Sequence, residues 1–396
     1  MAEPPKTIVI GGAGFGGMTA ALKLERRLRD NPDWNIVLVD KNPYQLYAPA
    51  LYEIAAIPKE EVDQIGLKSV ITIPIADILI GKKIVFVRGE ITSCDRENRS
   101  VSVRGGKIDY DFLVLALGSE TNYFDIPGLR EYALPLKRFE DAVRIRDRIE
   151  RMLAERRELT LVVGGAGATG VELIAEFSNF ICYLAKRILR SPTCPVRLTL
   201  IEASDTILPG FDRQIMHHAH KRLTKLGIEI YTGTRITAVG PREIVLDHAK
   251  ALRYDILIWT GGVVSNPLCA VNEFLQIDDY AFVVGDAAGF VDVKTGKPLP
   301  QNVPVAQVQA RAVARNIVRV IEGKPKIPFR PAKKYPHVLA VGKKYAIADL
   351  IFIRFWGFAG WCAKLLIELR YFLFILSFPH AIRLWLKSIR AYISND

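Results

Sequence analysis

The chain has 396 residues and a formal net charge of +12, and half of its residues are hydrophobic. This length predicts two to three domains, and the composition supplies enough apolar side chains for buried cores. The five cysteines are scattered and form no C-x-x-C pair, which argues against a disulfide framework and a redox-active dithiol. No charged segment followed by an apolar one precedes the first strand, so we expect no secretion signal.

The first predicted element is an apolar strand that runs into a glycine-rich turn, with the sequence TIVIGGAGFGG over residues 7–17. The same pattern, TLVVGGAGATG, returns over residues 160–170. In G-x-G-x-x-G one glycine makes a tight turn, one lets the backbone approach a pyrophosphate, and one packs helix on strand. A single copy is a weak signal, but two copies in register predict two dinucleotide sites, one for a flavin and one for a nicotinamide.

A second predicted strand follows each turn and ends in a carboxylate, Asp40 after residues 35–39 and Glu202 after residues 196–201. A carboxylate at this position accepts hydrogen bonds from an adenosine ribose. Both acids lie farther along the chain than the usual spacing of about 20 residues, so we expect long intervening segments. The alternative is an acid at a strand end of an ordinary α/β fold.

A second internal repeat extends the first, because YDFLVLALG at residues 110–118 resembles YDILIWTG at residues 254–261. The duplicated unit is therefore a βαβ module with its final strand, and no shorter period indicates a solenoid. We predict an α/β fold with two Rossmann-like dinucleotide-binding domains, the second inserted in the first. Residues 1–122 and 251–330 would form the first dinucleotide-binding domain, and residues 123–250 the second.

Residues 282–286 form an apolar strand that ends in Gly-Asp, which suits an acid beside the ribityl chain or pyrophosphate of a flavin, although such turns are common. Helical spacing over residues 305–321 predicts a helix whose N-terminal end, with Gln307, points toward the group that Asp286 holds. Prolines between residues 325 and 331 then mark a linker.

Residues 331–396 hold ten Lys/Arg and three Asp/Glu, and their longest stretch without such residues has 12 residues. A membrane-spanning helix needs about 20 apolar residues, so we expect an amphipathic helix that anchors the chain in the membrane interface. The alternative is a helix that packs against the core or a second subunit, and binding of nucleic acid ranks last. On a helical projection one face carries Phe378, Ile382, Trp385, Ile389 and Tyr392, and another carries Arg383, Lys387 and Arg390.

These motifs together resemble the type II NADH dehydrogenases, which are single-subunit flavin NADH:quinone oxidoreductases attached to one membrane face. The likeness runs nearly end to end. The matching stretches are residues 12–17, 43–56, 115–120, 162–176, 201–211, 259–262, 283–286 and 366–371.

The resemblance implies a role for each matching residue at two cofactor sites. The FAD pyrophosphate would lie at the first glycine turn with Asp40 on its ribose, Ile91 at the adenine and Asp286 on the ribityl side. Glu172 matches a family acid near the nicotinamide. The implied FAD residues are Gly12, Gly14, Phe15, Gly16, Gly17, Asp40, Lys41, Ile91, Gly118, Gly285, Asp286 and Gln307. The implied NADH residues are Gly165, Gly167, Ala168, Thr169, Gly170, Glu202 and Gly261.

The family motif A-Q-x-A-x-Q at the flavin and quinone site reads A-Q-V-Q-A-R over residues 306–311. Gln307 is kept, Gln309 stands for the inner alanine, and Arg311 stands for the second glutamine. Arg311 could donate a hydrogen bond to a quinone carbonyl, or it could mark a different acceptor. Gln307, Arg311 and Lys364 are the quinone candidates, with a lipid-facing lysine as the alternative for Lys364. Glu172 and Gln307 are the expected catalytic residues, and no metal is expected.

The activity that the resemblance implies is transfer of hydride from NADH to FAD and then of two electrons to a membrane quinone, without proton pumping. The alternatives are a sulfide:quinone or other quinone reductase of the same fold, or a flavin- and NADH-binding sensor without turnover. We expect a peripheral, monotopic protein at the cytoplasmic face of the cell membrane. Its expected partners are a membrane quinone, an anionic lipid surface and, through the C-terminal region, a second copy. The position of Glu202 predicts a preference for NADH over NADPH.

Overall fold

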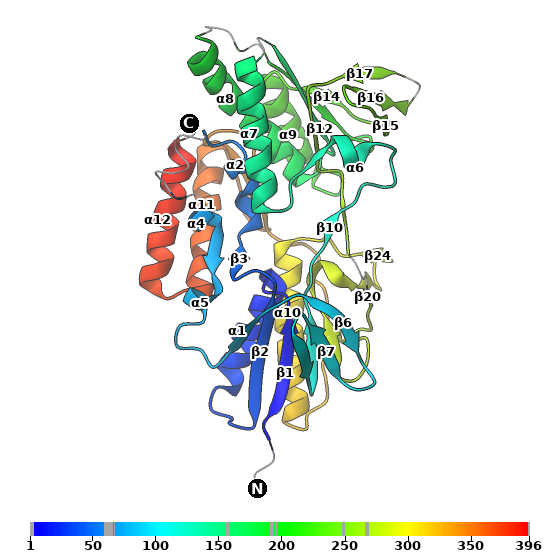
Figure 1. Cartoon of the computed structure of the whole chain (residues 1–396), viewed down its shortest axis with the longest axis vertical. Helices are drawn as coiled ribbons and strands as arrows, with labels where there is room; N and C mark the ends of the chain where they lie inside the picture. Colours follow the sequence, from blue (N-terminus) through cyan, green and yellow to red (C-terminus); the bar gives the residue numbers. More distant parts are fainter. Residues whose placement is uncertain are drawn as a thin grey trace. The chain divides into compact units, whose positions relative to one another are not determined.

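The computed structural model describes residues 4–58, 66, 68–155, 158–190, 194, 196–247, 250–265 and 269–394. The chain forms two compact units (Figure 1). The first unit comprises residues 1–46, 72–120 and 264–335, and the second comprises residues 47–71, 121–263 and 336–396.

The first unit is built on a five-stranded parallel sheet. Ile8, Val9 and Ile10 of its central strand are fully buried, as expected for a parallel strand covered on both faces. Helices α1 (Phe15–Leu28) and α10 (Val303–Ile321) pack side by side against the sheet (Figure 1). The strand order is β21 (Ala281–Val283), β9 (Phe112–Leu115), β1 (Lys6–Gly11), β2 (Trp34–Asp40) and β5 (Val85–Arg88).

Short elements complete the first unit. An antiparallel three-stranded sheet comprises β6 (Ile91–Asp95), β7 (Ser100–Val103) and β8 (Gly106–Asp109). The others are β3 (Tyr44–Leu46), β4 (Thr72–Pro74), α5 (Ile75–Ile78), β20 (Cys269–Ala270), η3 (Gly285–Ala287), β22 (Ala288–Gly289), β23 (Val291–Asp292) and β24 (Lys297–Pro298). The two-residue strands β10 (Glu120–Thr121) and β19 (Val263–Val264) lie where the chain passes between the units.

The second unit repeats the same plan. Its parallel sheet has the order β11 (Leu134–Pro135), β18 (Ile256–Trp259), β12 (Leu159–Gly164), β13 (Val196–Ile201) and β14 (Glu229–Tyr231). Its helices include α6 (Leu129–Tyr132), α7 (Phe139–Glu155), α8 (Ala168–Leu189) and α9 (Arg213–Lys225), and its antiparallel sheet contains β15 (Ile236–Val239), β16 (Glu243–Leu246) and β17 (Ala251–Arg253). Residues 47–71 add η1 (Ala48–Ala50), α2 (Leu51–Ile54) and α4 (Lys68–Ile71).

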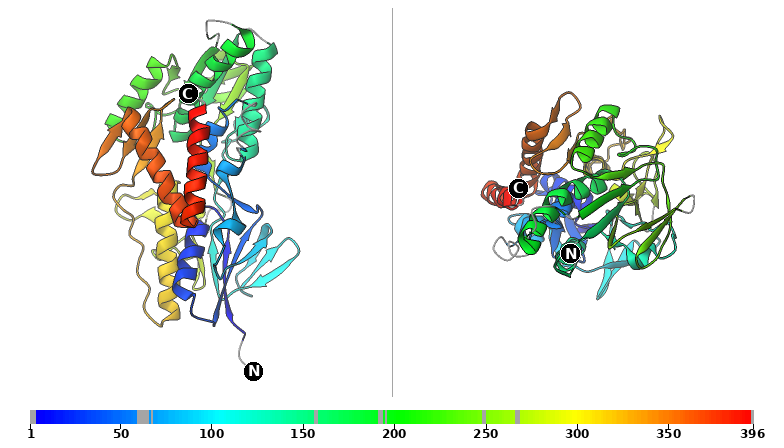
Figure 2. Two further views of the ribbon diagram at one scale, coloured as in Figure 1. Left: turned by 90° about the vertical axis from the view of Figure 1, so that its left-hand side faces the viewer. Right: turned by 90° about the horizontal axis from the view of Figure 1, so that it is seen from above.

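The C-terminal residues complete this second unit. They form an antiparallel sheet of β25 (His337–Ala340), β26 (Ala346–Asp349) and β27 (Arg354–Trp356), followed by α11 (Gly357–Ile375) and α12 (Phe378–Ser394). Helix α11 packs against both β26 and α12, as Figure 2 shows in orange and red. The hydrophobic effect stabilises α11 in this position, because its Tyr371, Phe372 and Ile375 are buried.

Among the described residues, the structure has no helix with the length and apolar character needed to cross a membrane.

Three predictions require correction. The predicted domain boundary at residue 250 is wrong, because β18 pairs with β12 and so completes the second sheet. The C-terminal region is not a separate helical segment, because it starts with a β-sheet and belongs to the second unit. The projected apolar face of α12 is also wrong in part. The Tyr392 hydroxyl donates to Glu368 and the Trp385 indole donates to the carbonyl of Leu365, so both side chains face α11.

The structure contains a disulfide, although the scattered cysteines argue against a disulfide framework. Cys182 in α8 and Cys194 form a disulfide, with their Cα atoms 4.9 Å apart. The two residues are 12 positions apart in the chain. This spacing differs from the short C-x-x-C pattern by which paired cysteines are recognised in a sequence.

Candidate functional site

The first glycine turn leaves an open cradle at the N-terminal end of α1. Gly12 has a φ of +99°, where glycine is favoured, and a Cβ at Gly17 would collide with the carbonyl of Gly12. At Gly14, in contrast, a Cβ would meet nothing within 4 Å. Gly12 and Gly17 thus shape the turn, and Gly14 keeps the space in front of the helix open. That space fits a pyrophosphate, because the free N–H groups of a helix N-terminus bind anions.

The second glycine turn has the same geometry at the start of α8. Gly165 has a φ of +96°, a Cβ at Gly170 would collide with the carbonyl of Gly165, and Gly167 faces open space. The three glycines therefore have the same backbone environment in both turns: one at a positive φ, one facing open space and one packed against the turn. Phe15 and Gly16 lie in the first turn of α1, and Ala168 and Thr169 in the first turn of α8.

Each predicted ribose carboxylate is fixed by backbone N–H groups at the edge of its cradle. Asp40 accepts hydrogen bonds from the N–H groups of Ala13 at 2.7 Å and Asn42 at 2.8 Å. Glu202 accepts from the N–H groups of Ala166 at 2.7 Å and Ser204 at 2.9 Å. A carboxylate oxygen has two lone pairs, so each acid keeps acceptor capacity for ribose hydroxyls.

Other predicted cofactor residues lie around these turns. The side chain of Ile91 packs directly over Gly11, and Gly118 has a φ of +75°. A Cβ at Gly261 would collide with the Trp259 ring. Lys41 makes an exposed ion pair with Glu90, at 3.2 Å.

The Gly285–Asp286 turn is held by polar side chains of the first unit. The Ser119 hydroxyl donates to the Asp286 carboxylate at 2.5 Å, and the Gln301 amide donates to the Asp286 carbonyl at 3.1 Å. The Gly285 N–H donates to the Gln309 side-chain oxygen at 2.7 Å. Gln309 is buried on α10. The residue that departs from the family motif therefore supports the turn that Asp286 needs.

Gln307 and Arg311 lie one turn apart on α10, which places them on one side of the helix. Gln307 is half-buried and Arg311 is exposed. Burial, followed by the charge of Arg311, lowers the pKa of Lys23 on α1, so the guanidinium of Arg311 lies near that helix.

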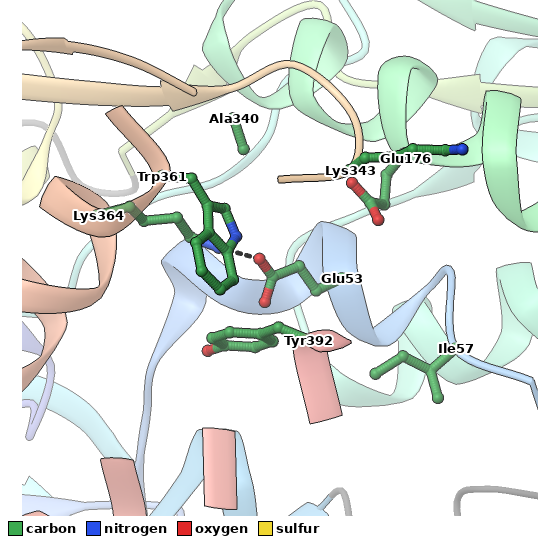
Figure 3. Close-up of a pocket in the computed structure, with 8 residues that line it drawn as sticks. All are labelled: Glu53, Ile57, Glu176, Ala340, Lys343, Trp361, Lys364 and Tyr392. Carbon is green, nitrogen blue, oxygen red and sulfur yellow. Dashed lines mark hydrogen bonds and ion pairs between the residues drawn. The ribbon is translucent and has the colours of Figure 1, made fainter. Parts of the chain in front are cut away.

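Sequence reasoning missed a buried cluster of charged residues in the second unit. The Lys364 ammonium forms an ion pair with Glu53 of α2, and it lies over the ring of Tyr392 at 4.4 Å (Figure 3). The Tyr52 hydroxyl donates to Glu53 at 3.1 Å. Only 15% of the Lys364 side chain is exposed, so the alternative of a lipid-facing lysine is wrong.

Glu172 and Glu176 of α8 and Glu368 of α11 complete this cluster. Glu172 accepts a hydrogen bond from the Ala340 N–H at 3.2 Å. Burial raises the pKa of Glu172 to about 8, and burial likewise raises the pKa of Glu368 to about 7. Burial alone would lower the pKa of Lys364, but the carboxylates of Glu53 and Glu368 outweigh it and raise that pKa. The cluster can therefore hold protons on its carboxyl groups near neutral pH.

A small cavity of about 10 Å³ opens into the cluster (Figure 3). This is room for about one water molecule. A water there would have several polar partners. The lining residues are Glu53, Ile57, Glu176, Ala340, Lys343, Trp361, Lys364 and Tyr392.

The two cradles define a class, the oxidoreductases that bind two dinucleotides in one chain. The family model described as pyridine nucleotide-disulphide oxidoreductase matches residues 6–310. Since this match covers more than half of the sequence, the chain belongs to that family.

Relatives and solved structures agree with this fold. A type II NADH:quinone oxidoreductase of Staphylococcus saprophyticus is 28% identical over 354 residues, which cover 83% of this chain and 86% of the relative. The structure of NDH2 from Plasmodium falciparum in complex with NADH has a TM-score of 0.82 at 19% identity, covering 97% of this chain and 98% of that one. The sulfide:quinone oxidoreductase of Aquifex aeolicus has a TM-score of 0.76 at 20% identity, covering 93% and 90%.

Proposed function

We propose that the chain is an FAD-dependent NADH:quinone oxidoreductase that works at a membrane surface without pumping protons. The observation that carries this proposal is the pair of glycine cradles, each with its own fixed ribose carboxylate. The name of the staphylococcal relative supports the choice of quinone as the acceptor. Steady-state oxidation of NADH with a water-soluble quinone as acceptor tests this proposed activity. A protein that binds both dinucleotides but fails to turn over would instead be a sensor.

The residues of the first cradle would hold FAD, and those of the second would hold NADH. When bound, FAD would supply the redox chemistry, which is the transfer of two electrons from NADH to the acceptor. The protein contributes orientation and proton supply. Gln307 is our candidate for steering the quinone, with Arg311 one turn along the same side of α10.

Reduction of a quinone to a quinol consumes two protons as well as two electrons. Glu172 suits a proton donor, because a carboxyl group with a pKa of about 8 keeps its proton at neutral pH. We assign Lys364 to the same supply of protons for the quinone, because it is charged and buried within this cluster.

Sulfide oxidation is the alternative that shares this fold, and it needs cysteines at the flavin. The scattered cysteines do not suggest such a pair, since no C-x-x-C occurs. The complete second cradle, with Glu202 held by the N–H of Ala166, favours NADH as the electron donor instead. An assay with sulfide as the electron donor should therefore give no turnover.

We expect the exposed apolar side chains of the two C-terminal helices to attach the protein to the cytoplasmic face of the membrane. Leu366 is 61% exposed on α11, and Phe378 is 69% exposed on α12. Arg383 and Arg390 are exposed on α12 and suit anionic headgroups. Other large exposed apolar residues of these helices are Phe358, Ile367, Leu373, Leu386 and Ile393.

Replacing Glu202 by alanine should narrow the preference for NADH over NADPH. The wild-type carboxylate would repel a 2′-phosphate, which is worth a few kcal/mol at most. Catalytic efficiency with the two cofactors, compared in wild type and Glu202→Ala, measures the change. Equal efficiencies in the wild-type protein would contradict the assignment of Glu202.

Replacing Gln307 by alanine should slow quinone reduction more than reduction of the bound flavin by NADH. Loss of one hydrogen bond to a neutral carbonyl costs about 1 kcal/mol, so we expect a several-fold effect. Stopped-flow measurement of the two half-reactions separates them. If the rates of flavin reduction and of quinone reduction fall equally, Gln307 does not act on the quinone.

The Glu172→Gln variant should remove a pH dependence of stability. The pKa of this carboxyl is raised from 4.5 to about 8, so the folded protein holds a proton that the unfolded chain releases. The free energy of unfolding therefore falls as pH rises between these two values. Above pH 8 the variant should be the more stable by at least about 1.4 kcal/mol, the equivalent of one pKa unit. Urea unfolding measures this, and the exposed Glu158→Gln provides the control.

A further inference from the structure

The tip of the β26–β27 hairpin in the second unit is apolar and exposed. Four residues, Leu-Ile-Phe-Ile at positions 350–353, join the two strands. Phe352 is 92% exposed, and Ile353 and Ile351 are 57% and 39% exposed. Turns usually carry glycine, asparagine, aspartate or serine. Four apolar residues in a row are therefore not expected in a turn that contacts only water.

The backbone at this tip makes its composition still less expected. Ile351 has a φ of +78°, a left-handed conformation that is a genuine outlier for a β-branched residue. Glycine or asparagine would adopt it with less strain. The chain keeps an isoleucine there despite the steric cost, which indicates a role for the apolar side chain itself.

Two backbone N–H groups of the tip already have acceptors within the hairpin. The Leu350 N–H donates to the Ile353 carbonyl at 2.9 Å, and the Ile351 N–H donates to the Asp349 carboxylate at 2.9 Å. A segment that enters a hydrocarbon phase must satisfy its N–H groups internally, because lipid offers no partner. The hairpin therefore satisfies these two N–H groups by itself, before it contacts lipid.

Charged residues mark the base of the tip. Arg354 pairs with Asp349 at 3.1 Å and with Asp212 at 2.9 Å, and it also donates to Gln214 at 2.7 Å. Asp212 is the N-cap of α9, so this helix begins beside the tip. Helix α9 contains four Lys/Arg, three His and no Asp or Glu. Its Arg213 is exposed next to the ion pairs.

From this arrangement we propose that the hairpin tip at residues 350–353 inserts into the membrane, with Arg213 of α9 at anionic headgroups. The short strand β27 joins the tip to α11, whose Phe358 is 62% exposed. Three side chains are too few for a stable protein interface, which buries about 800 Å² on each partner. The inference rests on the membrane attachment proposed above and adds a second element to it. Figure 2 shows the hairpin in brown, extending from the helices of its own unit in the right-hand view.

Partition onto vesicles of phosphatidylcholine and phosphatidylglycerol tests this insertion. Phe352→Ser in the full-length holoprotein should weaken partition about tenfold or more, because a buried phenylalanine side chain contributes that much. Val293→Ser is the matched control, since Val293 is 91% exposed beside the β23–β24 strands of the first unit. It should leave partition unchanged. Arg213→Gln should weaken binding about fivefold at low salt and much less at high salt.

The possible outcomes distinguish insertion of the hairpin tip from membrane attachment by α11 and α12. Every variant should keep its flavin absorbance and its activity with a water-soluble quinone. A Phe352→Ser protein that partitions like wild type overturns the inference and leaves attachment by α11 and α12 intact. If wild type itself does not bind the vesicles, the proposed membrane attachment fails together with the tip. If Phe352→Ser dissociates an oligomer without altering partition, the tip binds a second copy and the inference is also overturned.

Discussion

Replacing Gly14 by valine is expected to yield a folded protein that has lost FAD. A Cβ at Gly14 meets nothing within 4 Å in the chain, and the φ of −69° at this position suits any residue. The added side chain would instead occupy the space for the pyrophosphate, displacing at least two charge-assisted hydrogen bonds. These are worth about 1.5–3 kcal/mol each, so FAD affinity should fall by a hundredfold or more. Flavin absorbance after purification measures the loss, and circular dichroism checks the fold.

The neighbouring glycine provides a contrasting control. Gly17→Ala places a Cβ against the carbonyl of Gly12, so it should disrupt the turn and the packing of α1 whether FAD is present or not. Gly167→Val should retain the yellow colour but block flavin reduction by NADH, because Gly167 opens the second cradle. A Gly14→Val protein that retains full FAD would contradict the placement of the pyrophosphate.

Replacing Lys364 by methionine is expected to destabilise the second unit severely. The change removes the positive charge that faces Glu53 in a buried cluster. Breaking a buried ion pair from one side typically costs about 3–5 kcal/mol, because the remaining charge is left uncompensated. The free energy of unfolding in urea measures the loss. The loss should shrink at acid pH, where the remaining carboxyl group can take up a proton.

The double variant Glu53→Gln/Lys364→Met distinguishes charge from packing. It removes both charges while keeping side chains of similar size, so it should recover most of the lost stability. Quinone turnover should stay low in both variants if Lys364 belongs to the proton supply. Wild-type stability in the single variant would mean that the ion pair is not formed in solution.

The two glycine turns could be predicted from the sequence because their geometry is local. The turn at Gly12, the open position at Gly14 and the close packing at Gly17 all lie within six residues. The carboxylates could be predicted as well, since strand ends of a parallel sheet meet at one edge. The predicted boundary at residue 250 comes too early, because β18 pairs with β12 of the second sheet just as β9 pairs with β1 of the first.

The buried charged cluster could not be predicted in the same way. Glu53 and Lys364 are 311 residues apart, and each alone is an ordinary charged residue in an amphipathic segment. The apolar face of α12 was misassigned in part for a related reason. A stripe that packs against α11, as Tyr392 does, has the same helical spacing as one that faces lipid. Only the tertiary contacts separate the two.

The visible spectrum of the purified protein under anaerobic conditions tests the central claim most directly. We predict the absorbance of one non-covalent FAD per chain, its bleaching on addition of NADH, and its return on addition of a quinone. No flavin in the folded protein, or a bound flavin that NADH does not bleach, would contradict the account. Bleaching by NADH without return on quinone addition would contradict the assignment of quinone as the acceptor.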